Sequence, residues 1–158
     1  MFQSAYRKDH STKTAMLRVV NDLLRVIDEG KNTIVISMLD LSAAFDTIDH
    51  NILLSRLYHN FGITGTALDW FKSYLTNRRQ IVTIADVRSQ ARCVPFGVPQ
   101  GSVLGPVLFV LYTVPLGNLI SAHGLMYHLY ADDSQIYDIA QVETDVKIRK
   151  FESCTEDI

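Results

Sequence analysis

The sequence LMYHLYADDSQIYDIA, residues 125–140, contains two short runs of apolar and aromatic residues separated by the pair Asp132-Asp133. Short apolar runs that flank two turn-forming residues are typical of a β-hairpin. We therefore expect strands over Leu125–Ala131 and Ser134–Ala140, with two carboxylates at the turn between them. Taken alone, an Asp-Asp pair is good turn chemistry, and it favours a structural role over a metal site.

A third carboxylate, Asp40, ends another strand-like segment. Residues Thr33–Asp40, TIVISMLD, are short and rich in β-branched side chains, which predicts a largely buried strand. A carboxylate at the end of a buried strand is unfavourable unless it is paired or bound to a cation. If this strand lies beside the hairpin, Asp40 and Asp132 converge, and their hard oxygen donors suit Mg²⁺. Neighbouring strand residues point to opposite faces, so we expect Asp132 to be the direct ligand and Asp133 the outer one.

Helical patterns flank these strands. Ser11–Gly30 is amphipathic, and the residues expected on its inward face are Met16, Val19, Val20, Leu23 and Ile27. Further helices are expected over Asp49–Asn60, over Thr66–Leu75, after Ser102 and in the charged tail from Glu143.

A second hairpin is predicted by two short β-type runs, Gln80–Ala85 and Arg88–Val94. The arginines in and before it, Arg78, Arg79, Arg88 and Arg92, are opposed only by Asp86. For Arg78 and Arg79, phosphate contact and a solvated turn are equally good interpretations.

Composition and charge exclude several classes of protein. Two cysteines are too few for a disulfide framework, and no Cys or His has zinc spacing, so we expect an intracellular protein, nuclear or cytoplasmic, that is not secreted. A net charge of −2 argues against a free-standing nucleic-acid binder. The unbroken apolar stretch Val103–Leu116 is shorter than the roughly 20 residues that a bilayer requires, so we expect a buried helix and no membrane partner.

Three blocks occur in order along the chain: SMLDLSAAFDTIDHNILLSRL at 37–57, GVPQGSVLGPVLF at 97–109 and YADDSQIY at 130–137. Together they resemble the palm of reverse transcriptases, most closely those of non-LTR (LINE-type) retrotransposons, and the resemblance extends over nearly the whole chain. It implies a partial reverse transcriptase domain over residues 1–158, truncated at both ends. The implied fold is α+β and palm-like, with an antiparallel sheet backed by the helices that begin near Ser11, Asp49 and Ser102. The fingers remnant would cover about residues 1–32, and the palm about residues 33–158.

The resemblance also implies the metal ligands. Asp40, Asp132 and Asp133 would be the catalytic carboxylates and would bind two Mg²⁺ ions, for which Mn²⁺ could substitute. The carbonyl of Leu41 would complete one metal shell. Phe45 would lie under the incoming sugar as a steric gate against a 2′-hydroxyl, although on the residues alone it is an ordinary core aromatic.

Nucleic-acid and nucleotide contacts are implied for the second block. Pro99-Gln100-Gly101-Ser102 would form the loop and helix start that contact template and nucleotide. Gly101 lets the backbone approach a base pair closely, and Ser102 at a helix N-terminus favours nearby negative charge. Arg7 matches a basic position of the upstream block, and Arg78 with Arg79 would contact nucleic acid. The remaining candidates are not assigned to the site. Asp46 and Asp49 are expected as cap and surface acids, and none of the five histidines is given a role.

The implied function is template-directed DNA synthesis, in which a primer 3′-hydroxyl attacks a dNTP on an RNA template. One ion would lower the pKa of that hydroxyl and the other would stabilise the leaving pyrophosphate. The alternative is a catalytically inert remnant of a mobile element. Because the frame is short, we expect the isolated chain to extend primers poorly or not at all.

Other acidic sites fit the sequence less well. A phosphatase of the haloacid dehalogenase type needs a second acid two residues after its nucleophile, whereas Asp40 is followed by Leu41 and Ser42. A viral RNA-dependent RNA polymerase usually has Gly before the paired acids, where this chain has Ala131. Group II intron and telomerase relatives share the palm chemistry and are less close.

Overall fold

The computed structural model describes residues 3–6, 8–28, 35–41, 43–139 and 144–158. The chain divides into two compact units. The first consists of Met1–Ser42 and Thr113–Ile158, and the second of Ala43–Tyr112. These boundaries are not those expected for fingers and palm, so that division stays a prediction.

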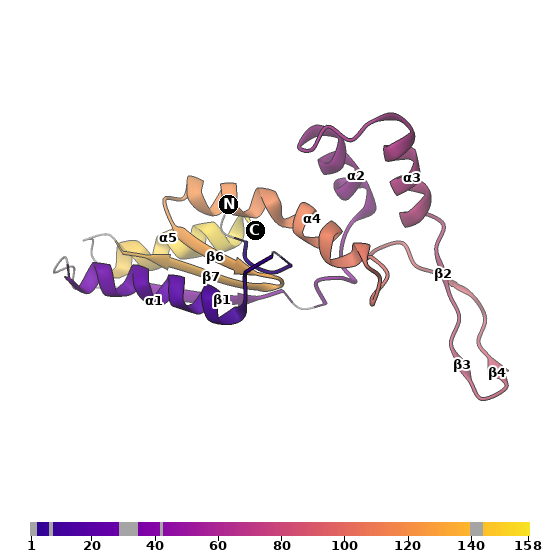
Figure 1. Cartoon of the computed structure of the whole chain (residues 1–158), viewed down its shortest axis with the longest axis horizontal. Helices are drawn as coiled ribbons and strands as arrows, with labels where there is room; N and C mark the ends of the chain where they lie inside the picture. The colour runs from indigo at the N-terminus through magenta and orange to yellow at the C-terminus, as the bar shows by residue number, and fades with distance from the viewer. Residues whose placement is uncertain (1–2, 7, 29–34, 42, 140–143) are drawn as a thin grey trace. The chain divides into compact units, whose positions relative to one another are not determined.

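The first unit contains a three-stranded antiparallel sheet in the order β1-β7-β6 (Figure 1). Its strands are β1 (Val35–Asp40), β6 (Met126–Tyr130) and β7 (Asp133–Asp138). The predicted hairpin is confirmed, because β6 and β7 pair on either side of a two-residue turn, but that turn is Ala131-Asp132 and Asp133 is already the first residue of β7. The strand that ends in Asp40 pairs with β7, as far as Asp40 opposite Asp133.

Helices cover both faces of this sheet, which confirms the α+β class. On one face the Tyr137 hydroxyl donates a hydrogen bond of 2.7 Å to Asp22 of α1 (Thr12–Asp28). Neighbouring strand residues point to opposite faces, and Ile136 packs on the other face in the main core cluster. The rest of that cluster comes from Ile120 in α4 (Leu104–Ala122), Leu125, and Phe151 with Cys154 in α5 (Thr144–Glu156).

One of the predicted backing helices is placed wrongly. The helix near Asp49, α2 (His50–His59), belongs to the second unit, where it packs against α3 (Gly65–Leu75). Leu53, Leu57 and Leu75 are fully buried there. Within the first unit the sheet is backed by α1, α4 and α5.

The predicted inward face of α1 is also wrong in part. The buried residues are Ala15, Val19 and Val26, whereas Met16 and Ile27 are 55% and 60% exposed. The row that faces the sheet follows helical spacing through Asp22, whose carboxylate is the acceptor of the Tyr137 hydrogen bond. Since this row includes a small residue and an acid, apolar periodicity alone favoured the neighbouring row.

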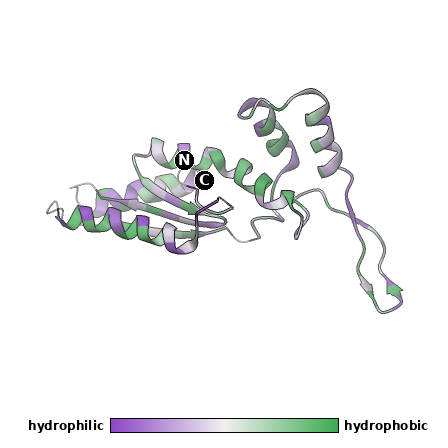
Figure 2. Cartoon of the chain, in the orientation of Figure 1, coloured by the Kyte–Doolittle hydropathy of each residue, from purple (hydrophilic) through white to green (hydrophobic). Residues whose placement is uncertain are grey.

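Helix α4 is longer than predicted and runs through Pro115. It is hydrophobic along most of its length (Figure 2). Its 19 residues are long and apolar enough to cross a membrane, so the length argument against a span is wrong. This is weak evidence for a membrane, because core helices of soluble proteins meet the same criterion. Its residues Leu108, Phe109 and Ile120 are buried.

The second unit also contains the predicted arginine-bearing hairpin. Its short strands pair at two places: β2 (Arg79–Gln80) with β5 (Arg92–Cys93), and β3 (Thr83–Ile84) with β4 (Val87–Arg88).

Asp49 caps α2 as predicted, because its side chain accepts hydrogen bonds from the backbone N–H groups of Asn51 and Ile52.

Burial makes His128 a pH-sensitive element of the first unit. Burial lowers the pKa of His128, and the nearby Arg18 cation lowers it further, although Asp22 opposes the shift. The unfolded chain binds this proton near pH 6.5 while the folded chain resists it, so stability falls as the pH decreases through that value. We expect a lower thermal midpoint by circular dichroism at pH 5.5 than at pH 7.5, with part of the difference lost in His128→Asn. An undiminished difference in that variant would assign the titration to another group.

Candidate active site

The sheet of the first unit brings Asp40 and the hairpin acids to one end. Asp40 lies directly opposite Asp133, and Asp132 follows Ala131 in the adjoining turn. Side chains directly opposite in an antiparallel pair lie on the same face, with Cβ atoms about 5 Å apart. The expected approach of Asp40 to the hairpin is therefore confirmed for the backbone. The partner in register is Asp133 and not Asp132, and the separate ligand roles of the two stay predictions.

These carboxylates fit a divalent cation in chemistry but only partly in arrangement. Among the described residues none of the three has a hydrogen-bond or ion-pair partner for its side chain. Two like charges directly opposite on a sheet are destabilising, and a hard cation would relieve that repulsion. However, within the described ranges no three His, Cys, Asp or Glu side chains are gathered closely enough to hold a metal ion. The backbone places two carboxylates together, and the third does not converge on them.

The turn that carries Asp132 is strained. Ala131 has a φ of 55°, in the left-handed region where residues other than glycine are uncommon. The glycine expected in viral RNA polymerases at this position is replaced here by alanine that keeps a glycine-like conformation. Leu41, the other residue implied as a metal ligand, directly follows β1 and is half-buried. Arg7, implied as a substrate contact, lies outside the described residues.

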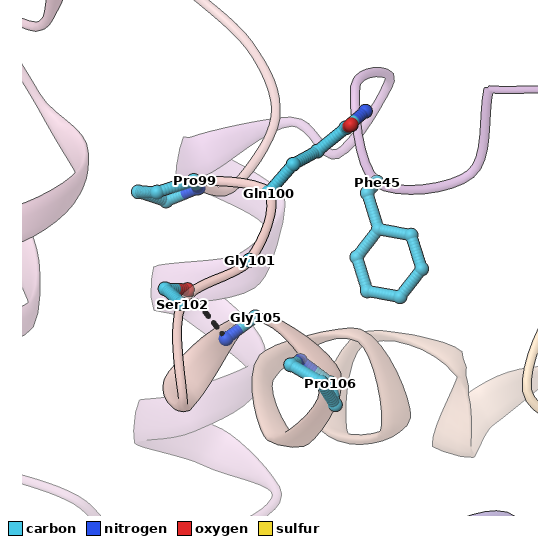
Figure 3. Close-up of a pocket in the computed structure, with 7 residues that line it drawn as sticks. All are labelled: Phe45, Pro99, Gln100, Gly101, Ser102, Gly105 and Pro106. Atoms are coloured by element: carbon cyan, nitrogen blue, oxygen red, sulfur yellow. Dashed lines mark hydrogen bonds between the residues drawn. The ribbon is translucent and has the colours of Figure 1, made fainter.

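The second unit contains a pocket of about 370 Å³ that brings the residues of the second block together with Phe45. Its lining residues are Phe45, Pro99, Gln100, Gly101, Ser102, Gly105 and Pro106. Figure 3 shows Phe45 and the Pro99–Ser102 loop on opposite sides of this pocket. The Ser102 hydroxyl accepts a hydrogen bond of 3.0 Å from the Gly105 N–H and so caps the first turn of α4, as predicted.

Phe45 packs as a core aromatic, and its role as a steric gate stays a prediction. Its ring centroid lies 5.1 Å from that of Phe109, a contact typical of core aromatics. Its side chain is nevertheless half-buried and lines the pocket. One part of the ring is therefore fixed by packing while another part is available to a ligand.

Two contacts that sequence reasoning missed hold the Gln100 loop. Asp46 is exposed, as predicted, but the Gln100 amide nitrogen also donates to both of its carboxylate oxygens, at 3.0 and 2.9 Å. Nε2 of His50, a buried residue, lies 2.8 Å from the Gly97 carbonyl oxygen. These partners are far apart along the chain, and no local pattern could have revealed them.

Arg78 and Arg79 differ in their surroundings. Arg78 is half-buried and donates a hydrogen bond to the Gly97 carbonyl, which gives it a structural contact. Arg79 is exposed. Both line a concave, polar surface that also includes Asp46 and Gln100. Their contact with nucleic acid stays a prediction.

Residues 1–157 match the family described as "Reverse transcriptase (RNA-dependent DNA polymerase)". The match includes both carboxylate-bearing strands, the Gln100 loop and Phe45. The chain therefore belongs to the reverse transcriptase family.

Its relatives come from mobile elements. The chain is 34% identical over 84% of its length to the RNA-directed DNA polymerase from mobile element jockey of Drosophila funebris, of which it covers 15%. It is 35% identical over 83% of its length to the probable RNA-directed DNA polymerase from transposon X-element of Drosophila melanogaster, of which it covers 14%. These matches confirm the resemblance to non-LTR reverse transcriptases, and they show that the chain spans only about 15% of such relatives.

A solved structure, the "Partial Cas6-RT-Cas1--Cas2 complex", is 23% identical to the chain. The match covers 96% of this chain and 25% of that one, with a TM-score of 0.41.

Proposed function

We propose that this chain is the catalytic-core segment of an RNA-directed DNA polymerase of a mobile element. The reaction is template-directed addition of a dNTP to a primer 3′-hydroxyl. The observation that carries the proposal is the register that sets Asp40 opposite Asp133, next to Asp132, within a chain of the reverse transcriptase family.

Asp40, Asp132 and Asp133, with the carbonyl of Leu41, would hold the divalent ions, Mg²⁺ or Mn²⁺. When bound, two such ions activate the attacking hydroxyl and stabilise the leaving phosphate oxygens. The ladder between β1 and β7 fixes the Cα positions of two of these ligands, so the chain contributes a rigid base for the charged donors. No side chain is needed as a general base.

The pocket of the second unit supports a role in nucleotide and template binding. Phe45 offers an apolar wall, and Pro99-Gln100-Gly101-Ser102 offers backbone close to the ligand. Asp46 orients the Gln100 side chain through its paired hydrogen bonds. Arg79, with Arg78 and Arg7, would contact phosphates of the RNA template, the DNA primer or the triphosphate.

Primer extension on homopolymer RNA, with Mg²⁺ or Mn²⁺, tests this function. We expect weak or no extension by the isolated chain, so the decisive form replaces the matching segment of the jockey polymerase by residues 1–158. That chimera should extend primers, and the same chimera with Asp132→Asn should not. The proposal would be contradicted by a folded chimera that binds primer and template but extends the primer no better than its Asp132→Asn version does. That result would favour the inert remnant.

Phe45 should control sugar discrimination in the same chimera. Phe45→Ala shortens the pocket wall, and we expect ribonucleotide incorporation to rise by at least about tenfold, since excluding a hydroxyl by a steric wall is worth a few kcal/mol. The ratio of kcat/KM for dNTP and rNTP measures this. An unchanged ratio would assign Phe45 to packing against Phe109 alone.

A further inference from the structure

We propose that Gln3 is a positioning residue for the hairpin that carries Asp132 and Asp133. Its carboxamide fixes the Ala131 backbone, and through it the place of the adjacent carboxylate. The proposal rests on the proposed function, because the value of a fixed turn is that these acids meet a cation.

Gln3 is anchored to the hairpin at two points, one of them through its side chain. It is 2% exposed, and its Oε1 accepts a hydrogen bond of 3.2 Å from the Ala131 N–H. The same oxygen accepts a hydrogen bond of 2.9 Å from the Ala5 N–H. The backbone of Gln3 bridges Leu129 in parallel, and the Ser4 N–H donates to the Leu129 carbonyl at 3.0 Å. The segment therefore follows the last residues of β6 up to the turn.

The Ala131 N–H needs this partner. Ala131 lies beyond the Tyr130–Asp133 pair that ends the β6–β7 ladder, so the ladder leaves its N–H without an acceptor. A partly buried backbone N–H without an acceptor is costly. Ala131 also holds a φ of 55°, a conformation that persists only when neighbouring contacts enforce it. The Gln3 oxygen supplies both the acceptor and the restraint.

A neutral acceptor suits this position. A glutamine oxygen stabilises the turn without adding charge beside three carboxylates, two of which already face each other. The strain at Ala131 and the anchor at Gln3 act on the same peptide unit, one residue before Asp132. Loss of the anchor should therefore widen the range of positions that the Asp132 carboxylate adopts.

The test uses the full chain and two readouts. Gln3→Leu removes the acceptor with little change of volume. Gln3→Glu keeps an acceptor oxygen at the same reach but adds a charge, so it is compared by amide exchange alone. Amide hydrogen exchange of Ala131, followed by NMR, should be at least about fivefold faster in Gln3→Leu and protected in Gln3→Glu. Mn²⁺ affinity, followed by electron paramagnetic resonance, should fall roughly tenfold in Gln3→Leu, as for other groups that orient metal ligands.

Tyr137→Phe is the matched control. It removes a partly buried hydrogen bond from the far end of β7, so it should lower stability while leaving Ala131 exchange and Mn²⁺ affinity unchanged. Equal exchange and equal Mn²⁺ affinity in Gln3→Leu and the unmodified chain would overturn the positioning role, provided that circular dichroism shows both folded. If the unmodified chain and Asp132→Asn bind Mn²⁺ equally, the proposed metal site fails, and Ala131 exchange still decides whether Gln3 holds the turn.

Discussion

Substituting Gly97 by alanine is expected to destabilise the second unit by about 3 kcal/mol or more. Gly97 has a φ of +79°, and a Cβ at this position would lie 2.8 Å from the Asp46 Cα and 2.8 Å from the Phe45 carbonyl oxygen. Both obstacles are backbone atoms and cannot rotate away. Urea unfolding followed by the fluorescence of Trp70, the single tryptophan, reports on this unit, because Trp70 lies in α3.

Gly62→Ala separates conformational strain from the close approach. Gly62 has a φ of +66°, and nothing lies within 4 Å of the Cβ that alanine would add. This control should therefore lose only the roughly 1–2 kcal/mol of the left-handed conformation. If Gly97→Ala lowers stability no more than Gly62→Ala does, Gly97 does not lie as close to the backbone of Phe45 and Asp46 as the structure indicates.

This close approach matters to the pocket. The Gly97 N–H donates to the Ile48 carbonyl and the Val98 N–H donates to the Phe45 carbonyl, each at 2.8 Å. The two loops that carry Phe45 and Gln100 are thus joined by backbone bonds, and a bulkier residue at 97 would separate them. In the chimera, a loss of sugar discrimination should accompany the loss of stability.

Asp40→Asn is expected to act in opposite directions on stability and on metal binding. Removing one of two directly opposed charges should raise the free energy of unfolding by a few tenths of a kcal/mol. Losing a charged donor should weaken Mn²⁺ binding by roughly tenfold or more. Urea unfolding and a Mn²⁺ titration by electron paramagnetic resonance measure the two effects on the same sample.

Asp86→Asn removes the same charge from an exposed position between β3 and β4 in the second unit. It should change neither Mn²⁺ affinity nor, by more than a few tenths of a kcal/mol, stability. A structural role of Asp40 would give the reverse result for Asp40→Asn, namely lower stability with unchanged affinity.

Local patterns predicted the elements well because their causes are local. The apolar runs around Asp132-Asp133 form the hairpin, and Asp49 caps its helix through N–H groups two and three residues ahead. The strand before Asp40 is described from Val35 onward, and Thr33 and the expected helix end at Gly30 lie outside the described residues. The resemblance to a known family rested on three blocks that occur in a fixed order, and no single motif could have established it.

Contacts between distant segments escaped prediction. The inward face of α1 was assigned to its most apolar row, but Tyr137, more than a hundred residues away, selects the row of Asp22. The Asp46–Gln100 pair and the Gln3–Ala131 contact likewise join segments that no periodicity connects. The Asp40–Asp133 register depends on which strands pair, and this is decided by the packing of the whole sheet.

A Mn²⁺ titration observed by NMR tests the central claim most directly. Paramagnetic broadening should appear first, and together, at the backbone amides of residues 39–41 and 131–134, and excess Mg²⁺ should reverse it. The same titration of Asp40→Asn should leave both segments sharp at that concentration. Broadening of only one of the two segments, or of acids elsewhere before them, would contradict a shared cation site at this end of the sheet.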